Sequence, residues 1–497
     1  MPSIARNAIW NVIAGMSMAI VSVALPPFLA RLLDRDSFGA WALALQMAGY
    51  VNLLNFGLQV IVGRLVAHAE ALEDRARRDR VVATAFATLA LAGLVGVAAL
   101  AALSLRLDLI VPQAPAALRP QLGLTIVLIA VAYGVQLPSS VFGGVFIGLR
   151  RNGMYATGLI VTRGLTFIAV LALAFITRSL VGMGLAWLGA SLVGAVVKAA
   201  LWKSYSPQPR LAFSDFRLAT LWELGRDGMA FTVWNLAMLM VSGFQLLIVA
   251  RVDFANVGTF AVSSSIALFV SGIMEAVCST LVPHISHLMA IGDTSEVKKA
   301  LHTVTIASVL LSTLMSIGLI AIADPIMAVW MGKLANPQGA MILTLLVAAQ
   351  TARNALMAYV MVSVALGLQR RMLWTPVLEG LAAMAFSIWL GHQYGATGVA
   401  LGVALGALVG VVLVSLQNVL RLAVPGFTIA DYLANDVLRP LSGFLLALAI
   451  FVYFHRSGHV GLGYSAAVLT LGMLVTLVAT RNRIGDLAQF LLRRAHA

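Results

Sequence analysis

The sequence predicts an all-α membrane protein that crosses the bilayer many times, and three observations support this prediction. Of its 497 residues, 61% are hydrophobic and only 10% are charged, whereas soluble proteins carry about 25% charged residues. Runs of about 20 apolar residues, the length that a transmembrane helix needs, recur along the whole sequence. The connections between the runs are short, so they leave no room for an extramembrane domain.

The apolar runs predict about 14 transmembrane helices. The first run is too long to be the apolar core of a cleaved signal peptide. The approximate bounds of the runs are 8–31, 38–66, 81–105, 121–147, 154–176, 180–201, 226–250, 257–283, 300–322, 338–367, 373–393, 396–420, 437–454 and 462–480. The single cysteine, Cys278, excludes an intramolecular disulfide and a cysteine-based metal site.

The positions of Lys and Arg predict the orientation in the membrane. The net charge is +14, and nearly all basic residues lie between the apolar runs. Those at the two termini and in the even-numbered connections outnumber the others by about three to one. Because Lys and Arg collect on the cytoplasmic side, both termini are expected there. This placement also argues against nucleic acid as a partner.

Three pairs of similar segments indicate an internal repeat. The pairs are ARLLDRDSFGAW (30–41) with ARVDFANVGTF (250–260), GLRRN (148–152) with GLQRR (367–371), and GLAWLGASLVG (184–194) with GVALGVALGALVG (398–410). They occur in the same order at nearly one offset, which predicts two parallel six-helix lobes around a central cavity. Chance similarity among helices rich in Gly, Ala and Leu is the alternative.

The repeat predicts four parts of the chain. We expect a first lobe at residues 1–203, a cytoplasmic linker at 204–225 and a second lobe at 226–421. Two extra helices and a cytoplasmic tail then occupy residues 422–497.

Polar residues follow one face of several predicted helices. These are Asn55 and Gln59 in the second helix, Asn235 and Gln245 in the seventh, and Gln350, Arg353 and Asn354 in the tenth. Residues three or four positions apart lie over one another on a helix. We expect this set to line a central substrate-binding cavity. For the uncharged members, hydrogen bonding between neighbouring helices is the alternative.

Four charged residues fall inside predicted helices: Arg163, Glu275, Arg353 and Glu379. Such residues usually mark a substrate or ion pathway, and an internal ion pair between one of the glutamates and an arginine is the alternative. The first six predicted helices contain no Asp or Glu, so Arg163 makes that side of the cavity cationic. Because the planar fork of arginine forms two parallel hydrogen bonds with a phosphate, we expect Arg163 and Arg353 to contact an anionic substrate. Glu275 and Glu379 are candidates for ion coupling.

Nothing in the sequence predicts an enzyme, a cofactor or a metal site. His284 and His287 have the spacing of helical metal ligands, but they follow Pro283 and lack a supporting cluster. No phosphate-binding loop is present, so the protein is not expected to hydrolyse ATP itself. Energy for transport would come from an ion gradient or from removal of the substrate downstream.

The sequence resembles the Wzx-type polysaccharide flippases. The resemblance begins in residues 6–67, with an A-R-x-L element at Ala30, an aromatic-Gly pair at Phe38 and an L-x-x-x-G-L stretch at Leu53. It continues in LLIVARVDFANVGTFAVSSSI (246–266), PIMAVWMG (325–332) and YGATGVALGVALG (394–406). Each motif is mostly Gly and apolar residues, so their order and spacing carry the resemblance.

This resemblance implies a superfamily that also holds the lipid II flippase MurJ and the MATE drug exporters. Its members have two six-helix lobes around a cavity and work by alternating access. The Wzx-type members move an undecaprenyl-diphosphate-linked oligosaccharide from the cytoplasmic to the periplasmic leaflet of the bacterial inner membrane. The implied partners are that lipid-linked glycan, membrane lipids, a polysaccharide polymerase and the export machinery.

Three alternatives remain open from the sequence. A MATE-like antiporter of drugs or metabolites would need a membrane carboxylate, for which Glu275 is the best candidate. Lipid II is another possible substrate, because the fold alone does not define the cargo. A membrane scaffold of a polysaccharide synthase would transport nothing.

Overall fold

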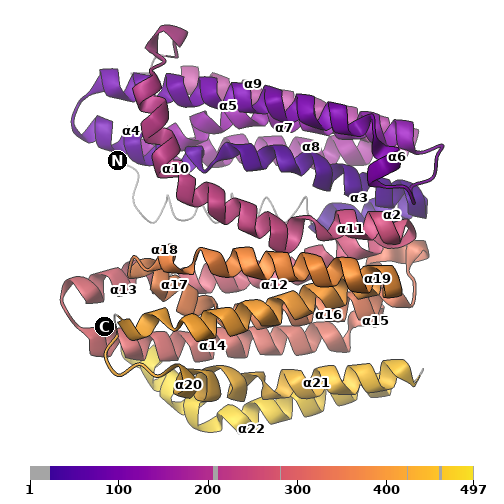
Figure 1. The fold of residues 1–497 in the computed structure, drawn as a ribbon, viewed down its shortest axis with the longest axis vertical. Helices are drawn as coiled ribbons and strands as arrows, with labels where there is room; N and C mark the ends of the chain where they lie inside the picture. Colours follow the sequence, from indigo (N-terminus) through magenta and orange to yellow (C-terminus); the bar gives the residue numbers. More distant parts are fainter. Residues whose placement is uncertain are drawn as a thin grey trace. The chain divides into compact units, whose positions relative to one another are not determined.

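The chain is helical almost throughout its described length (Figure 1). The computed structural model describes Trp10 and residues 23–204, 211–279, 281–422, 424–457 and 462–495. Within these ranges no strand occurs, and 11 helical stretches are long and apolar enough to span a membrane. The predicted all-α polytopic class is confirmed, and the total of 14 helices stays a prediction. Most of the first predicted helix lies outside the described residues.

The chain divides into two compact units, which are described separately. The first comprises Met1–Leu236, Val249–Ala261 and Met331–Leu334. Its helices are α2 (Leu25–Leu32), α3 (Arg35–Gly49), α4 (Leu58–Ala71), α5 (Arg75–Ser104), α6 (Leu107–Ile110), α7 (Arg119–Gly148), α8 (Asn152–Thr177), α9 (Leu180–Lys203) and most of α10 (Leu218–Met238). Helix α7 is at the centre of this unit, because it packs against α3, α4, α5, α8 and α9.

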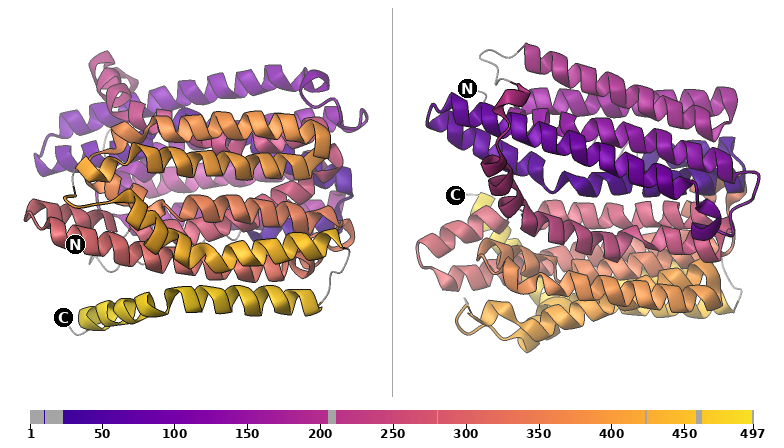
Figure 2. Two further views of the ribbon diagram at one scale, coloured as in Figure 1. Left: turned by 60° about the horizontal axis from the view of Figure 1, so that its bottom comes forward. Right: turned by 45° about the horizontal axis from the view of Figure 1, so that its top comes forward.

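The second unit comprises Ala237–Ile248, Val262–Trp330 and Ala335–Ala497. Its elements include α11 (Gln245–Val252) and α12 (Val257–Ser279), both shared with the first unit, and then α13 (Leu281–Ala290), α14 (Thr294–Ala321), α15 (Ala323–Met331), α16 (Gln338–Asn354), α17 (Met357–Ala365), α18 (Gln369–Met372), α19 (Trp374–Gln417), α20 (Ile429–Tyr432), α21 (Arg439–Arg456) and α22 (Leu462–Ala495). Helix α14 is central here and packs against α13, α16, α17, α21 and α22. In Figure 2, α21 and α22 form the last pair along the chain.

The first repeated segment takes a similar local structure in both copies. Asp34 accepts a hydrogen bond from the backbone N–H of Ser37, three residues later, and so caps α3. At the same place in the second copy, Asp253 accepts one from the side chain of Asn256, again three residues later. The two copies also touch, because Arg35 donates to the Ala255 carbonyl at 2.7 Å. Burial would raise the pKa of Asp34, but its hydrogen bonds with Ser37 outweigh burial and lower the pKa.

Helix α19 is two antiparallel legs joined at one glycine. Gly395 has φ 58° and ψ −142°, a conformation that other residues rarely adopt, so the predicted boundary between the eleventh and twelfth helices falls at this turn. On the second leg, every fourth residue is a glycine that faces the first leg. In order, Gly398, Gly402, Gly406 and Gly410 lie against Leu390, Ser387, Ala383 and Glu379. Small residues at this spacing allow two membrane helices to approach closely.

Three predicted transmembrane helices are interrupted where their polar residues lie. The second breaks between α3 and α4, where a 3₁₀ turn ends at Asn55 and Phe56 and Gly57 take positive φ. The seventh breaks at a π-helical turn, Leu239–Gly243, between α10 and α11. The tenth breaks directly after Asn354, between α16 and α17. In membrane transporters, broken helices of this kind commonly surround the substrate or ion.

Candidate functional site

In the first unit, the break before α4 brings Asn55 and Gln59 against α7. The side chain of Asn55 donates to the Ser140 hydroxyl at 3.3 Å. Gln59 lies over Gly143 together with the ring of Tyr155, since a Cβ built on that glycine would be 3.2 Å from the Gln59 amide nitrogen and 3.1 Å from the ring. The two predicted residues of the second helix are therefore brought together on one face of α7.

Arg163 lies on α8, two turns after Tyr155, and interacts electrostatically with Tyr155 and Lys198. Lys198 comes from the neighbouring helix α9, and its stem covers Gly158, where an added Cβ would come within 2.9 Å of the Lys198 Cγ. Both cations are half-buried. Neither α8 nor α9 contains an Asp or Glu. This pair of helices therefore carries two cations inside predicted membrane spans, without an acid from either helix.

In the second unit, Arg353 and Glu379 form an ion pair that joins α16 to the first leg of α19. Arg353 Nε donates to Glu379 Oε1 at 2.5 Å, and the two side chains are only 16% and 11% exposed. Gln350 accepts from Arg353 Nη1 at 3.4 Å and from the Ser271 hydroxyl of α12 at 3.2 Å. The internal ion pair that the sequence left as an alternative is thus what Glu379 forms.

One donor of Arg353 is left over in this network. Its Nη2 is buried and has no hydrogen-bond partner among the described residues. Asn354, the next residue, donates to the Ser312 hydroxyl of α14 at 3.5 Å. Gln350 and Arg353 therefore belong to one network, and Asn354 belongs to a separate contact between helices.

Gln245 lies near this network. Its buried side chain donates to the carbonyls of Met240 and Val241 in the π-helical turn. The same two residues pack against Gly380, which follows Glu379 on α19. Gln245 therefore supplies a hydrogen-bond donor to two carbonyls of the interrupted helix. The side chain of Asn235 lies outside the described residues.

The remaining carboxylate, Glu275, is exposed on α12, one turn after Ser271. It is the more accessible of the two glutamates that the sequence nominated for ion coupling. No group of three or more potential metal-binding side chains occurs in the part of the chain that the structure describes.

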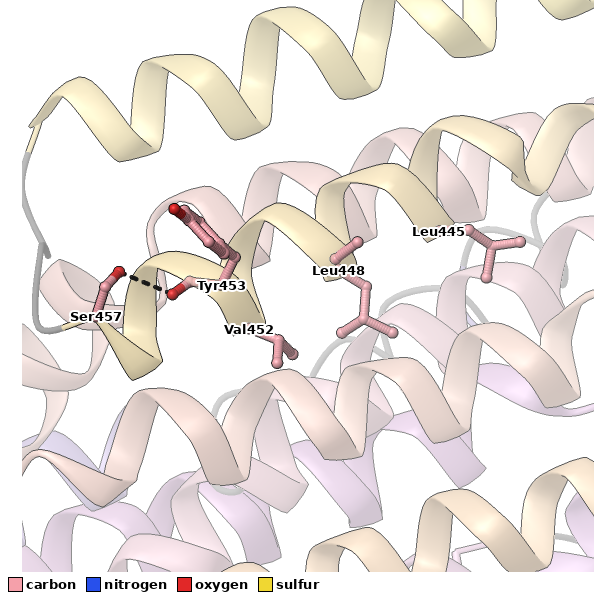
Figure 3. Close-up of a pocket in the computed structure, with 6 residues that line it drawn as sticks. Leu445, Leu448, Val452, Tyr453 and Ser457 are labelled. Carbon is pink, nitrogen blue, oxygen red and sulfur yellow. Dashed lines mark hydrogen bonds between the residues drawn. The ribbon is translucent and has the colours of Figure 1, made fainter.

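A pocket of about 710 Å³ lies along α21 (Figure 3). It is lined by Leu445, Leu448, Ala449, Val452, Tyr453 and Ser457, and the Ser457 hydroxyl donates to the Tyr453 carbonyl at 2.9 Å. None of the predicted site residues lines it. Its lining is almost entirely apolar, so it is suited to a hydrocarbon chain rather than to a charged group.

Sequence reasoning missed the two residues that interact with Arg163, which are the cation Lys198 and the neutral Tyr155. Lys198 lies near the end of the sixth predicted helix, where a lysine is also expected from its preference for the cytoplasmic side. The missed signal is spacing along α8, since Tyr155 and Arg163 are eight residues apart and lie on roughly the same face.

Three solved structures have a similar fold. The chain resembles an inward-facing multidrug resistance MATE family transporter of the MOP superfamily, with a TM-score of 0.66, 14% identity, and coverage of 82% of this chain and 98% of the other. It also resembles the lipid II flippase MurJ in an inward closed conformation, with a TM-score of 0.68, 14% identity, and coverage of 97% and 100%. A MATE transporter from Vibrio cholerae, VcmN, matches with a TM-score of 0.55, 17% identity, and coverage of 83% and 94%.

These matches show that the protein has the fold of the MATE and MurJ transporters and flippases. The model of the polysaccharide biosynthesis protein family matches residues 4–289. The chain therefore belongs to the polysaccharide biosynthesis protein family, and the resemblance to the flippases is confirmed. No curated protein matches the sequence.

Proposed function

We propose that this protein is a flippase for undecaprenyl-diphosphate-linked oligosaccharides, which it moves from the cytoplasmic to the periplasmic leaflet for polysaccharide biosynthesis. The observation that carries the proposal is the pair of cations, Arg163 and Lys198, on two membrane helices that contain no acid. Membership of the polysaccharide biosynthesis protein family supports a cargo used in polysaccharide biosynthesis.

The chemistry of such a cargo explains why cations are needed inside the membrane. A diphosphate and its sugars are strongly hydrated, and moving them through about 30 Å of hydrocarbon without compensation is prohibitively costly. Arg163 provides a planar fork for two phosphate oxygens, and Lys198 provides a mobile point charge beside it. Asn55 and Gln59 supply amides to the sugar hydroxyls. The polyprenyl tail stays in lipid throughout.

In the second unit, Arg353 is the proposed contact for the cargo, with Gln350 in the same hydrogen-bond network. Gln245, Asn354 and Asn235 stay predicted members of the cavity. The Arg353 Nη2 is a buried donor without a partner among the described residues. A phosphate oxygen accepting from Nη2 would share the guanidinium with Glu379, which already accepts from Nε. Glu379 and the cargo would therefore bind different nitrogens of Arg353, and Glu275 is the more exposed candidate for ion coupling.

The proposed setting is the bacterial inner membrane, with both termini in the cytoplasm. The predicted lobes, residues 1–203 and 226–421, would open alternately to the two sides, while residues 422–497 add two helices. The flipped glycan would pass to a polysaccharide polymerase and the export machinery.

Replacing the cations tests this proposal. We expect Arg163→Ala and Lys198→Ala each to slow export by about 10- to 150-fold, the effect of losing a hydrogen bond to a charged group. Lipid-linked repeat units should accumulate on the cytoplasmic face, measured by their accessibility to a glycosidase in spheroplasts and inverted vesicles. Arg163→Lys should recover part of the activity, because it restores charge without the fork.

Arg178→Ala is the matched control, since Arg178 lies at the exposed end of the same helix α8. Normal export by both variants would rule out the proposed role and favour a scaffold that transports nothing. Loss of drug efflux in Glu275→Gln, with export intact, would favour a MATE-like antiporter. Rescue of a MurJ-depleted strain would indicate lipid II as the cargo.

A further inference from the structure

One face of α7 carries polar and aromatic residues that are not explained by the packing of the first unit alone. Tyr133, Gln136 and Ser140 have i, i+3 and i+7 spacing, so they share this face, and Gly143 continues it. The three side chains are half-buried, although α7 is the central helix of the unit. From Tyr133 to Gly143 this polar stripe extends about 15 Å along the helix.

Aromatic rings lie at both ends of the stripe. At one end, the ring of Tyr133 is 6.3 Å from that of Trp187 on α9, which is 6.0 Å from the ring of Trp41 on α3. The indole Nε1 of Trp187 is buried and has no hydrogen-bond partner among the described residues. At the other end, the ring of Tyr155 on α8 lies over Gly143, since a Cβ built there would be 3.1 Å from two ring carbons. Tyr155 is also half-buried, so neither tyrosine is sealed inside the core.

Amide side chains lie between the two tyrosines. Gln136 donates to the Ser191 hydroxyl of α9 at 2.8 Å, and Asn55 donates to the Ser140 hydroxyl at 3.3 Å. A primary amide has two N–H donors and an oxygen acceptor, and each of these bonds to serine uses one donor. Gln136 and Asn55 therefore keep hydrogen-bonding capacity for a further group.

The stripe itself is uncharged, and cations lie to one side of it. After Arg119, its first residue, α7 contains no charged side chain. Tyr155 interacts electrostatically with Arg163, which is about 12 Å further along α8. A group bound on the stripe would therefore be a neutral part of the cargo, next to the proposed site of the diphosphate.

The chemistry of the stripe fits a chain of neutral sugars. A pyranose has apolar C–H faces and a rim of hydroxyl groups. The C–H face stacks on an aromatic ring, whose face carries partial negative charge, and the hydroxyls both donate to and accept from amides. A purely apolar cargo would leave the amides without partners, which is costly in a water-poor site.

We propose that this face of α7 binds the glycan of the cargo, with Tyr133 and Tyr155 stacking on sugar rings and Gln136 and Asn55 binding sugar hydroxyls. The inference rests on the proposed flippase function and adds how a loaded carrier is distinguished from a sugar-free one. Cations alone would bind any lipid diphosphate. The stripe makes the affinity depend on the sugars, so the protein selects the loaded carrier.

The test compares two probes that differ only in the glycan, which are undecaprenyl diphosphate and the same lipid carrying a disaccharide of N-acetylglucosamine. Native mass spectrometry of the full-length protein in detergent measures the Kd of each probe. The readout is the ratio of the two Kd values, because a change that affects only the phosphates cancels in the ratio. Wild type should bind the glycan-linked probe at least about tenfold more tightly.

We expect Tyr133→Leu, Tyr155→Leu and Gln136→Leu each to lower this ratio by about 2- to 13-fold, the effect of losing one stacked ring or one neutral hydrogen bond. Tyr155→Phe should keep the ratio, because the ring remains. Arg163→Ala should weaken the binding of both probes equally, because both carry the diphosphate, and so leave the ratio unchanged.

The matched controls are Tyr394→Leu and Gln393→Leu, which change exposed residues of the same types on α19. Both Kd values should stay as in wild type. Thermal unfolding in detergent shows which variants are folded. Because Tyr133 and Tyr155 lie on different helices, each tests the stripe if the other variant does not fold.

The failures of the two proposals are distinguishable. If wild type binds neither probe, the proposed function is wrong. If wild type binds both probes equally, or if the ratio persists in the three leucine variants, the glycan-binding stripe is wrong and the flippase function stands. An equal loss in Tyr155→Phe and Tyr155→Leu would show that this ring does not stack on a sugar.

Discussion

Arg353 shows how a permanently charged side chain is held inside a membrane helix. It is stabilised by a glutamate 26 residues later in the sequence, and the two charges are nearly buried. A buried ion pair often adds little net stability, because desolvation cancels most of the attraction. Removing only one of the two residues, however, leaves a buried charge without a partner. The pair therefore constrains which substitutions the two positions tolerate.

A double-mutant cycle tests this account of the pair. Arg353→Met alone and Glu379→Leu alone should each lower the free energy of unfolding by about 3–5 kcal/mol, because the remaining charge has no partner. The double variant should lose much less, because two apolar side chains fill the site without a charge. Thermal unfolding in detergent measures all three proteins. Equal losses that simply add in the double variant would show that the two residues do not stabilise each other.

At the scale of elements, the interruptions of membrane helices coincide with the polar residues. The breaks lie near Asn55, at Leu239–Gly243 and after Asn354, and the end of a helix leaves backbone groups without intrahelical partners. In hydrocarbon such groups must be satisfied locally. Gln245 does this for two carbonyls of the π-helical turn. Gln245 therefore serves the backbone, whereas Asn55 and Asn354 bind side chains of neighbouring helices.

The glycines of α19 allow a prediction about the packing of its two legs. Gly406→Leu should destabilise the protein by about 1–3 kcal/mol or more, because a side chain there meets Ala383 of the facing leg. Gly189→Leu on α9 is the matched control, since a Cβ at Gly189 meets nothing within 4 Å. The melting temperatures of the two variants in detergent make the comparison. A normal melting temperature for Gly406→Leu would mean that the legs separate easily.

At the scale of the whole molecule, the sequence predicted the class of fold because length and hydrophobicity are local properties. The helical ranges follow from runs of apolar residues, and Gly395 lies between two predicted helices. The break after Asn354 was not predictable, because no glycine or proline is adjacent to it. The sequence offered an ion pair between a glutamate and an arginine only as an alternative and left open which residues form it, since Glu379 is 26 residues from Arg353. Such contacts depend on how helices pack.

The single cysteine allows a direct test of the proposed orientation. Cys278 is fully buried, so it should react little with a membrane-impermeant maleimide. Leu72→Cys and Leu105→Cys place exposed thiols just beyond the two ends of α5. In intact cells, we expect labelling of Leu105→Cys only, because the loop near Leu72 is on the cytoplasmic side. Labelling of Leu72→Cys alone would reverse the proposed orientation.

The turn at Gly395 has a consequence for biosynthesis. A single non-helical residue joins the two legs of α19. The two legs therefore have no loop between them on the far side of the bilayer. We therefore expect the two legs to enter the membrane together as one hairpin. A substitution of Gly395 that prevents its backbone conformation should then lower the amount of protein made, because misinserted chains are degraded.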